Sequence, residues 1–229
     1  MTEGVKVKHP ATFSKAILER LDELVPDGVW LDPFAGTGKI EQLERPGREF
    51  VGIEIEPEWA LVALRMHMLI GDCRAVMRDM LIEKPRRPFD GVVTSPVYGN
   101  RMSDHHNAKD ASSRRSYKFD LGRDLSPGNA GMLYYWQDEY RELHFEAWNL
   151  ARRLTRDGGL MFLNVKNFYR TVKGEREEFR VVAGHVQMLK DTGWRVKKIV
   201  QVATPSMRHG ENHDARFDTE AIIIASNGG

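Results

Sequence analysis

Apolar strand-like segments alternate with helical segments along most of this 229-residue chain. Residues 29–34 (VWLDPF) and 49–56 (EFVGIEIE) are typical of buried strands, whereas residues 12–24 carry apolar side chains at helical spacing. Strands that alternate with helices favour an α/β fold built on a mainly parallel sheet. Further strands are expected at 68–72, 89–96, 160–167, 194–205 and 219–226, and further helices at 58–68, 136–155 and 176–191.

The last two predicted strands follow one another without an intervening helix, so one of them is expected to be antiparallel. Residues 99–133 show no regular apolar period and are rich in Arg, Ser, Asp, Asn and Gly. Long irregular segments in compact domains are usually functional or disordered, and this segment is predicted to be a long loop or an inserted lid. We therefore expect a single domain over residues 1–229, with a lid at 99–133.

The formal net charge is only +1, so any nucleic-acid binding must depend on a local basic patch. A single cysteine, Cys73, excludes disulfides and cysteine-based zinc sites within the chain. No stretch has the length and apolar character of a signal peptide or a membrane span. The histidines at 105–106 and at 209 and 213 lack cysteine partners, so no metal is expected. A cytoplasmic location without membrane association follows from the same features.

The glycine-rich segment LDPFAGTGKI (31–40) follows the first predicted strand. Gly36 and Gly38 allow a backbone turn to approach a ligand closely. Glu54 ends the second strand and Asp72 ends the third, and the carboxyl ends of parallel strands meet in one crevice. A carboxylate at position 54 favours recognition of a ribose diol, and a carboxylate at position 72 favours recognition of an adenine amino group. The phosphate-binding motif of ATPases is absent, and the turn also departs from the usual dinucleotide-binding pattern.

A second motif, TSPVY (94–98), ends the strand predicted at 89–96. Together with DPFAGTG (32–38) it resembles the paired motifs of the S-adenosylmethionine-dependent amino-methyltransferases of DNA, D-P-F-x-G-x-G and [D/N/S]-P-P-[Y/F/W]. KHPATF (8–13) resembles the N-terminal motif of the same family, which lies against the methionine part of the cofactor. The start of the lid, YGNRMSD, is similar to small bacteriophage methylases, and the resemblance covers most of the chain.

The resemblance implies a class I methyltransferase, Rossmann-like fold, with a seven-stranded, mostly parallel sheet and an inserted lid. It implies methyl transfer from S-adenosylmethionine to an exocyclic amine of a DNA base. The residues expected to bind the cofactor are His9, Phe13, Asp32, Phe34, Gly36, Gly38, Glu54, Asp72 and Cys73. Asp32 is expected to order the glycine-rich turn and to meet the methionine amino group. Cys73 lies at the cofactor rim, where a small buried residue is also a sufficient explanation.

The predicted catalytic residues are Ser95, Pro96 and Tyr98. The Ser95 hydroxyl and the Pro96 carbonyl are expected to accept hydrogen bonds from the target amine, so that catalysis consists mainly of positioning and desolvation. Tyr98 offers a ring for base stacking, worth roughly 1–3 kcal/mol. A base inside a duplex would have to be flipped out. Val97 replaces the second proline of the family motif and so leaves the loop less constrained.

Serine at the first motif position favours cytosine N4, as a tendency within the family. Adenine N6 of DNA, an RNA base, or a non-catalytic module that binds the cofactor or DNA stay open as alternatives. Transfer to cytosine C5 is disfavoured because that reaction requires a nucleophilic cysteine after a proline. The motif pair also suggests a bacteriophage or restriction-modification context, although no space for a separate target-recognition domain follows the last strand.

Residues 101–118 carry five cationic side chains against two aspartates, for a local charge of +3. This part of the lid is predicted to contact DNA phosphates, with RNA as a second possible partner. The side chains expected to do so are Arg101, Arg114, Arg115 and Lys118. The sequence does not decide between a monomer and a dimer.

Overall fold

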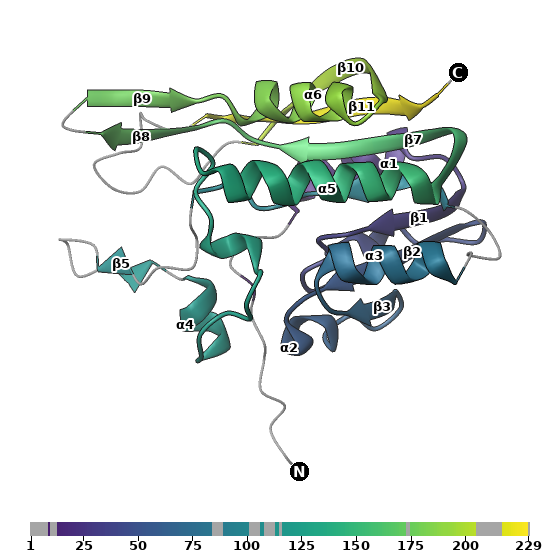
Figure 1. Cartoon of the computed structure of the whole chain (residues 1–229), viewed down its shortest axis with the longest axis horizontal. Helices are drawn as coiled ribbons and strands as arrows, with labels where there is room; N and C mark the ends of the chain where they lie inside the picture. The colour runs from purple at the N-terminus through teal and green to yellow at the C-terminus, as the bar shows by residue number, and fades with distance from the viewer. Residues whose placement is uncertain are drawn as a thin grey trace, which may run out of the picture.

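A computed structural model of the chain describes residues 9, 13–83, 89–100, 106–107, 113–114, 116–172, 175–204 and 217–228. Seven strands form one sheet, in the spatial order β3, β2, β1, β4, β7, β11, β10 (Figure 1). They are β1 (Gly28–Asp32), β2 (Arg48–Glu54), β3 (His67–Ile70), β4 (Phe89–Thr94), β7 (Thr155–Val165), β10 (Trp194–Ala203) and β11 (Thr219–Asn227).

Six of these strands run in the same direction, and β11 is antiparallel to both of its neighbours, β7 and β10. This arrangement confirms the predicted seven-stranded, mostly parallel sheet with an antiparallel strand in its final pair. Because the parallel strands all end at the same edge, the motifs that follow β1, β2, β3 and β4 come together there.

Helices cover both faces of the sheet (Figure 1). They are α1 (Lys15–Leu24), α2 (Pro57–Ala60), α3 (Cys73–Ile82), α4 (Tyr117–Leu121), α5 (Asp138–Leu154) and α6 (Val181–Asp191). Two short 3-10 turns are η1 (Lys39–Leu43) and η2 (Ala130–Met132). Two small hairpins pair β5 (His106–Asn107) with β6 (Ser113–Arg114), and β8 (Phe168–Val172) with β9 (Glu175–Phe179).

Successive side chains of a strand point to opposite faces, and this alternation divides the core into two layers. On β1, Leu31 packs in the layer beneath α3, α5 and α6, whereas Trp30 packs in the layer beneath α1. On β11, Ile223 and Ile222 divide in the same way. Strands buried on both faces explain the continuous apolar runs in the sequence.

Two predicted helices differ from the structure. The helix expected at 58–68 is only the short α2, because Glu41 accepts hydrogen bonds from the backbone N–H groups of Leu64 and Arg65 and holds residues 61–66 as turns. The helix expected at 176–191 begins only at Val181, because residues 175–179 pair with β8 as a strand.

No helix in the described part of the chain combines the length and the apolar character that a membrane crossing requires.

Candidate functional site

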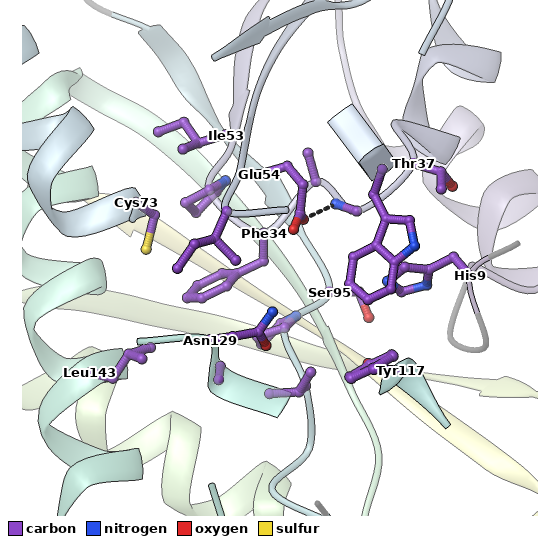
Figure 2. A pocket seen from close by; sticks show the side chains of 18 of the residues that line it. His9, Phe34, Thr37, Ile53, Glu54, Cys73, Ser95, Tyr117, Asn129 and Leu143 are labelled. Atoms are coloured by element: carbon purple, nitrogen blue, oxygen red, sulfur yellow. Dashed lines mark hydrogen bonds between the residues drawn. The ribbon is translucent and has the colours of Figure 1, made fainter. Parts of the chain in front are cut away.

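A cavity of about 340 Å³ lies at the carboxyl ends of β1, β2, β3 and β4 (Figure 2). Its lining includes residues 33–37 of the turn that follows β1 (residues 33–38, the glycine turn) and residues 95–98 after β4 (the acceptor corner). A cavity of this size is sufficient for a small organic ligand. The two sequence motifs therefore meet in one space, as the strand pattern predicted.

Glu54 connects the end of β2 to the glycine turn. One carboxylate oxygen accepts a hydrogen bond from the Gly36 backbone N–H at 2.8 Å, and the other accepts one from the Glu56 N–H at 2.9 Å. Gly36 and Gly38 have φ angles of 55° and 68°, which lie in the left-handed region. Burial raises the pKa of Glu54 to about 7, against these hydrogen bonds, which act to lower it.

Gly36 and Gly38 have different roles within the turn. Gly36 lines the cavity, but Gly38 is not among the lining residues. A methyl group added at Gly38 would lie 2.6 Å from the side chain of Ala63, so this glycine allows the turn to pack against residue 63. Gly36 thus faces the cavity, whereas Gly38 supports the turn from outside the lining.

Asp32 lies beneath the cavity and not in its wall. One carboxylate oxygen accepts hydrogen bonds from the Thr94 hydroxyl at 2.7 Å and the Phe34 N–H at 3.1 Å, and the other has no hydrogen-bond partner among the described residues. Thr94 is the last residue of β4, so Asp32 ties the glycine turn to the start of the acceptor corner. Burial raises the pKa of Asp32 to about 7.

Asp72 and Cys73 line the cavity at the start of α3. Asp72 caps the helix by accepting from the Arg74 N–H at 2.8 Å, and its carboxylate also pairs with the Arg74 guanidinium. Burial acts to raise the pKa of Asp72, but the contacts with Arg74 hold it below the ordinary value. Burial also raises the pKa of the Cys73 thiol, which therefore stays protonated and unsuited to nucleophilic attack.

Aromatic side chains contribute to the cavity lining around the remaining predicted cofactor residues, His9, Phe13 and Phe34. Figure 2 shows Glu54 and Phe34 between His9 and Tyr117 on one side and Cys73 on the other. The His9 ring lies 4.2 Å from the Trp59 ring and 5.2 Å from the Tyr117 ring, measured between centroids. Phe13 also lines this cavity.

In the acceptor corner, Ser95 and Tyr98 share hydrogen bonds with residues from two other strands. The Ser95 and Tyr98 hydroxyl oxygens lie 3.3 Å apart, and the amide nitrogen of Asn164 lies 3.2 Å from the first and 3.3 Å from the second. Pro96 and Glu220 complete this part of the lining. Asn164 lies next to the last residue of β7 and Glu220 is the second residue of β11, and neither was predicted from the sequence.

Val97 replaces the family's second proline, and buried groups hold its backbone carbonyl. The Tyr140 hydroxyl donates to this carbonyl at 2.9 Å and lies 3.0 Å from Nε2 of His185. Trp148 donates to Nδ1 of His185 at 3.2 Å, and burial lowers the pKa of His185 well below its ordinary value. A neutral His185 that accepts at Nδ1 carries its proton on Nε2, so Trp148, His185, Tyr140 and Val97 form one directed hydrogen-bond chain.

Removing the Tyr140 hydroxyl is expected to destabilise the fold and loosen the acceptor corner. Tyr140→Phe leaves the partners at Val97 and His185 unsatisfied in a buried region, so we expect the free energy of unfolding to fall by about 1–3 kcal/mol. Urea denaturation measures this change. Tyr135→Phe is the matched control, because that hydroxyl donates to the Arg180 carbonyl at the surface and its loss should have little effect. Equal losses of unfolding free energy in the two variants would contradict the role of the buried hydrogen-bond chain.

The lid is hydrogen-bonded to the fully buried side chain of Glu56, which follows the end of β2. Its carboxylate accepts hydrogen bonds from the Ser126 N–H, the Ser126 hydroxyl, the Asn129 amide and the Arg123 guanidinium, all within 2.7–2.9 Å. Asn129 in turn lines the cavity. Side chains alternate between the two sides of an extended chain, so the pattern IEIE (53–56) places Glu54 and Glu56 on the same side. This pattern is the sequence signal from which a site role for Glu56 could have been predicted.

An apolar cluster adds to the attachment of the lid. Tyr117 and Leu125 of the lid pack with Trp59 of α2, and Val97 packs against the same cluster. The Trp59 and Tyr117 rings lie 5.2 Å apart in an edge-to-face arrangement. The Val97 side chain thus connects the acceptor corner to the lid.

The predicted phosphate-contacting residues are described only in part. Lys118 lies on α4 and pairs with Asp124 at 2.8 Å. Arg114 belongs to the short strand β6, and Arg101 and Arg115 lie outside the described residues.

No protein-family model matches the sequence, and no curated protein matches it. Solved structures, however, do match the fold of this chain. A S-adenosylmethionine-dependent methyltransferase from Methanosarcina mazei aligns with a TM-score of 0.51 and 12% identity, over 88% of this chain and 93% of that one. TehB from Haemophilus influenzae aligns with a TM-score of 0.52 and 11% identity, over 96% of this chain and 64% of that one.

A DNA modification methylase from Thermus thermophilus, solved with S-adenosylmethionine, aligns less well. The match has a TM-score of 0.34 and 14% identity, over 39% of this chain and 38% of that one, so it carries no argument about substrate. The two longer alignments and the strand order establish the architecture. The chain has the class I, Rossmann-like fold of S-adenosylmethionine-dependent methyltransferases.

Proposed function

We propose that this protein transfers a methyl group from S-adenosylmethionine to an exocyclic amine of a DNA base, with cytosine N4 as the favoured acceptor. The observation that carries the proposal is the single cavity that joins the glycine turn to the acceptor corner. A methyl donor and an acceptor must lie in one enclosed space for in-line transfer.

The donor half of the cavity suits the nucleoside and methionine parts of the cofactor. Glu54 offers two carboxylate oxygens for the ribose diol, and Gly36 allows close approach of the backbone. Asp72 and Cys73 lie where an adenine edge would end. Asp32 supports the turn from beneath, so its proposed role is to order the turn. A direct contact between Asp32 and the methionine amino group is not required.

The acceptor half suits a flat amine. The Ser95 hydroxyl and the Pro96 carbonyl would hold the amino protons, and the Tyr98 ring would bound the base. The hydrogen-bond chain that ends at Val97 supports an active corner, because it restrains the backbone where the second proline is missing. This restraint favours an enzyme over a non-catalytic module.

Methyl transfer to nucleic acid tests the proposal. Incubation with S-adenosylmethionine carrying a tritiated methyl group is expected to label DNA from a methylation-deficient host. Ser95→Ala is expected to lower the rate about 10²-fold, because a hydrogen bond that orients the amine is lost, while cofactor affinity measured by calorimetry stays within about twofold. Ser226→Ala, near the end of β11 and outside the cavity lining, serves as the control.

Three outcomes are distinguished by this assay. Label in RNA alone would move the proposal to an RNA base. Cofactor binding without transfer to any nucleic acid would favour the non-catalytic module. Equal rates for the wild type and the Ser95→Ala variant would refute the role of the hydroxyl.

A further inference from the structure

Glu220 brings a carboxylate into the part of the cavity that the acceptor corner forms. One carboxylate oxygen accepts a hydrogen bond from the Asn164 amide at 2.9 Å and from the Tyr98 hydroxyl at 3.3 Å. The other oxygen lies 3.9 Å from the Lys166 ammonium group. Only 14% of the Glu220 side chain is exposed, and the residue lines the same cavity as Ser95.

These contacts leave the carboxylate with acceptor capacity. An ionised carboxylate has about four lone-pair sites, and the two neutral donors both bind the same oxygen. The ammonium group of Lys166 lies beyond ordinary hydrogen-bond distance from the other oxygen. The second oxygen is therefore able to accept a proton or a hydrogen bond from a bound molecule.

A carboxylate beside the acceptor constrains the class of acceptor. It repels an anionic nucleophile such as a thiolate or a carboxylate, and it attracts a group that becomes positive during the reaction. A neutral amine gains positive charge as its nitrogen attacks the methyl group. The Lys166 ammonium group offsets part of this charge but is not among the residues that line the cavity, so the carboxylate that faces the acceptor favours a neutral nitrogen nucleophile over an oxygen or sulfur anion.

We propose that Glu220 is the proton acceptor of the reaction and selects a neutral amine as the methyl acceptor. This inference rests on the proposed function. The nitrogen lone pair forms the new N–C bond, and the C–S bond breaks with its electron pair going to sulfur, which gives neutral S-adenosylhomocysteine. The nitrogen, now positively charged, loses one proton to the Glu220 carboxylate, and the resulting carboxylic acid releases that proton to solvent.

An inhibitor that carries a cation in place of the methyl group tests this role without any nucleic acid. Sinefungin has a primary amine where S-adenosylmethionine has its sulfonium methyl, whereas S-adenosylhomocysteine has neither. Calorimetry on the full chain is expected to give tighter binding of sinefungin than of S-adenosylhomocysteine. Glu220→Gln is expected to reduce this preference by about 10-fold while it changes the affinity for S-adenosylhomocysteine by less than about twofold.

Two further variants separate charge from structure. Glu220→Asp keeps the charge and is expected to retain most of the preference for sinefungin. Glu49→Gln, at an exposed position on β2, is expected to leave both affinities unchanged. A Glu220→Gln protein that keeps the full preference, or that weakens both ligands equally, would overturn the role of Glu220.

The two proposals fail in different ways. If the wild-type protein binds neither ligand, the proposed methyl transfer falls, and the role of Glu220 falls with it. If the wild type binds both ligands and Glu220→Gln changes nothing, only the role of Glu220 falls. Once an acceptor is in hand, Glu220→Gln should lower the single-turnover rate by about 10²–10⁴-fold, in the range of general acid–base catalysis.

Discussion

Replacing Glu54 by glutamine is expected to weaken S-adenosylmethionine binding by about 10²-fold or more. The carboxylate orders the glycine turn through the Gly36 N–H, and its oxygens are the proposed acceptors for the ribose hydroxyls. A hydrogen bond to a charged group contributes roughly 1.5–3 kcal/mol, and glutamine brings an NH₂ group against a backbone donor. Calorimetry measures the affinity directly.

The matched control for this substitution is Glu41→Gln. Glu41 also accepts backbone N–H groups, from Leu64 and Arg65, but it is not part of the cavity lining. We expect its replacement to leave cofactor affinity within about twofold. Equal effects of the two substitutions would show that Glu54 acts only through the stability of the turn.

The raised pKa of Glu54 gives two opposite pH dependences. Its pKa rises from an ordinary 4.5 to about 7, so the folded chain holds this proton more tightly than the unfolded chain. The free energy of unfolding should therefore fall as the pH rises from about 4.5 to about 7, and Asp32 acts in the same direction from 3.8 to about 7.

Cofactor affinity should instead rise with pH across the same interval, because the ionised form of Glu54 is the better acceptor. Thermal unfolding and calorimetry between pH 5 and pH 8, on the order of one measurement per half unit, follow both trends. Glu54→Gln should flatten the pH dependence of the affinity and reduce, but not abolish, that of the free energy of unfolding, because Asp32 still contributes to it. An affinity that is independent of pH in the wild type would argue against a contact between the cofactor and Glu54.

The second large effect is expected for Glu56→Ala, which should release the lid and lower the free energy of unfolding by about 2–4 kcal/mol. The substitution leaves the Ser126 N–H and the Asn129 amide without their shared acceptor in a buried region. It also removes a buried partner of Arg123. Denaturation in urea measures the loss, and hydrogen exchange should rise in residues 126–132.

Glu58→Ala provides the comparison, because Glu58 pairs with the same arginine at 2.6 Å from a position that is 43% exposed. Exposed ion pairs contribute roughly 0–1 kcal/mol, so this variant should stay close to the wild type. If both variants lose the same stability, the ion pair with Arg123 is what holds the lid. In that case the buried hydrogen bonds of Glu56 contribute little.

The parts of the fold that sequence reasoning predicted correctly are those set by local pattern. Continuous apolar runs predicted the buried parallel strands, and the ends of those strands predicted that Gly36, Glu54 and Ser95 would share one cavity. This works because parallel strands end at a common edge whatever the details of packing.

The errors arise where distant contacts outweigh local preference. The segment 58–68 has helical composition, yet the carboxylate of Glu41 binds three successive N–H groups at 64–66 and prevents the helix from continuing. Residues 175–179 also favour a helix by composition, but they pair with β8, where Phe179 stacks on Phe168 at 5.1 Å. Neither contact is visible from the segment alone.

The missed site residues have a similar cause. Asn164 and Glu220 reach the acceptor corner because β11 lies antiparallel to β7, which places the start of one strand beside the end of the other. A single acidic residue before the apolar run AIIIAS carries no sequence signal for that register. His185 likewise reaches Tyr140 only through the packing of α6 on α5.

The most direct test of the central claim is mass spectrometry of nucleosides from DNA incubated with the wild-type protein and S-adenosylmethionine that carries a deuterated methyl group. We expect a labelled nucleoside methylated on an exocyclic nitrogen, N4 of cytosine first and N6 of adenine second. A label found only on a ring carbon, or no labelled nucleoside from a protein that binds the cofactor, would contradict it.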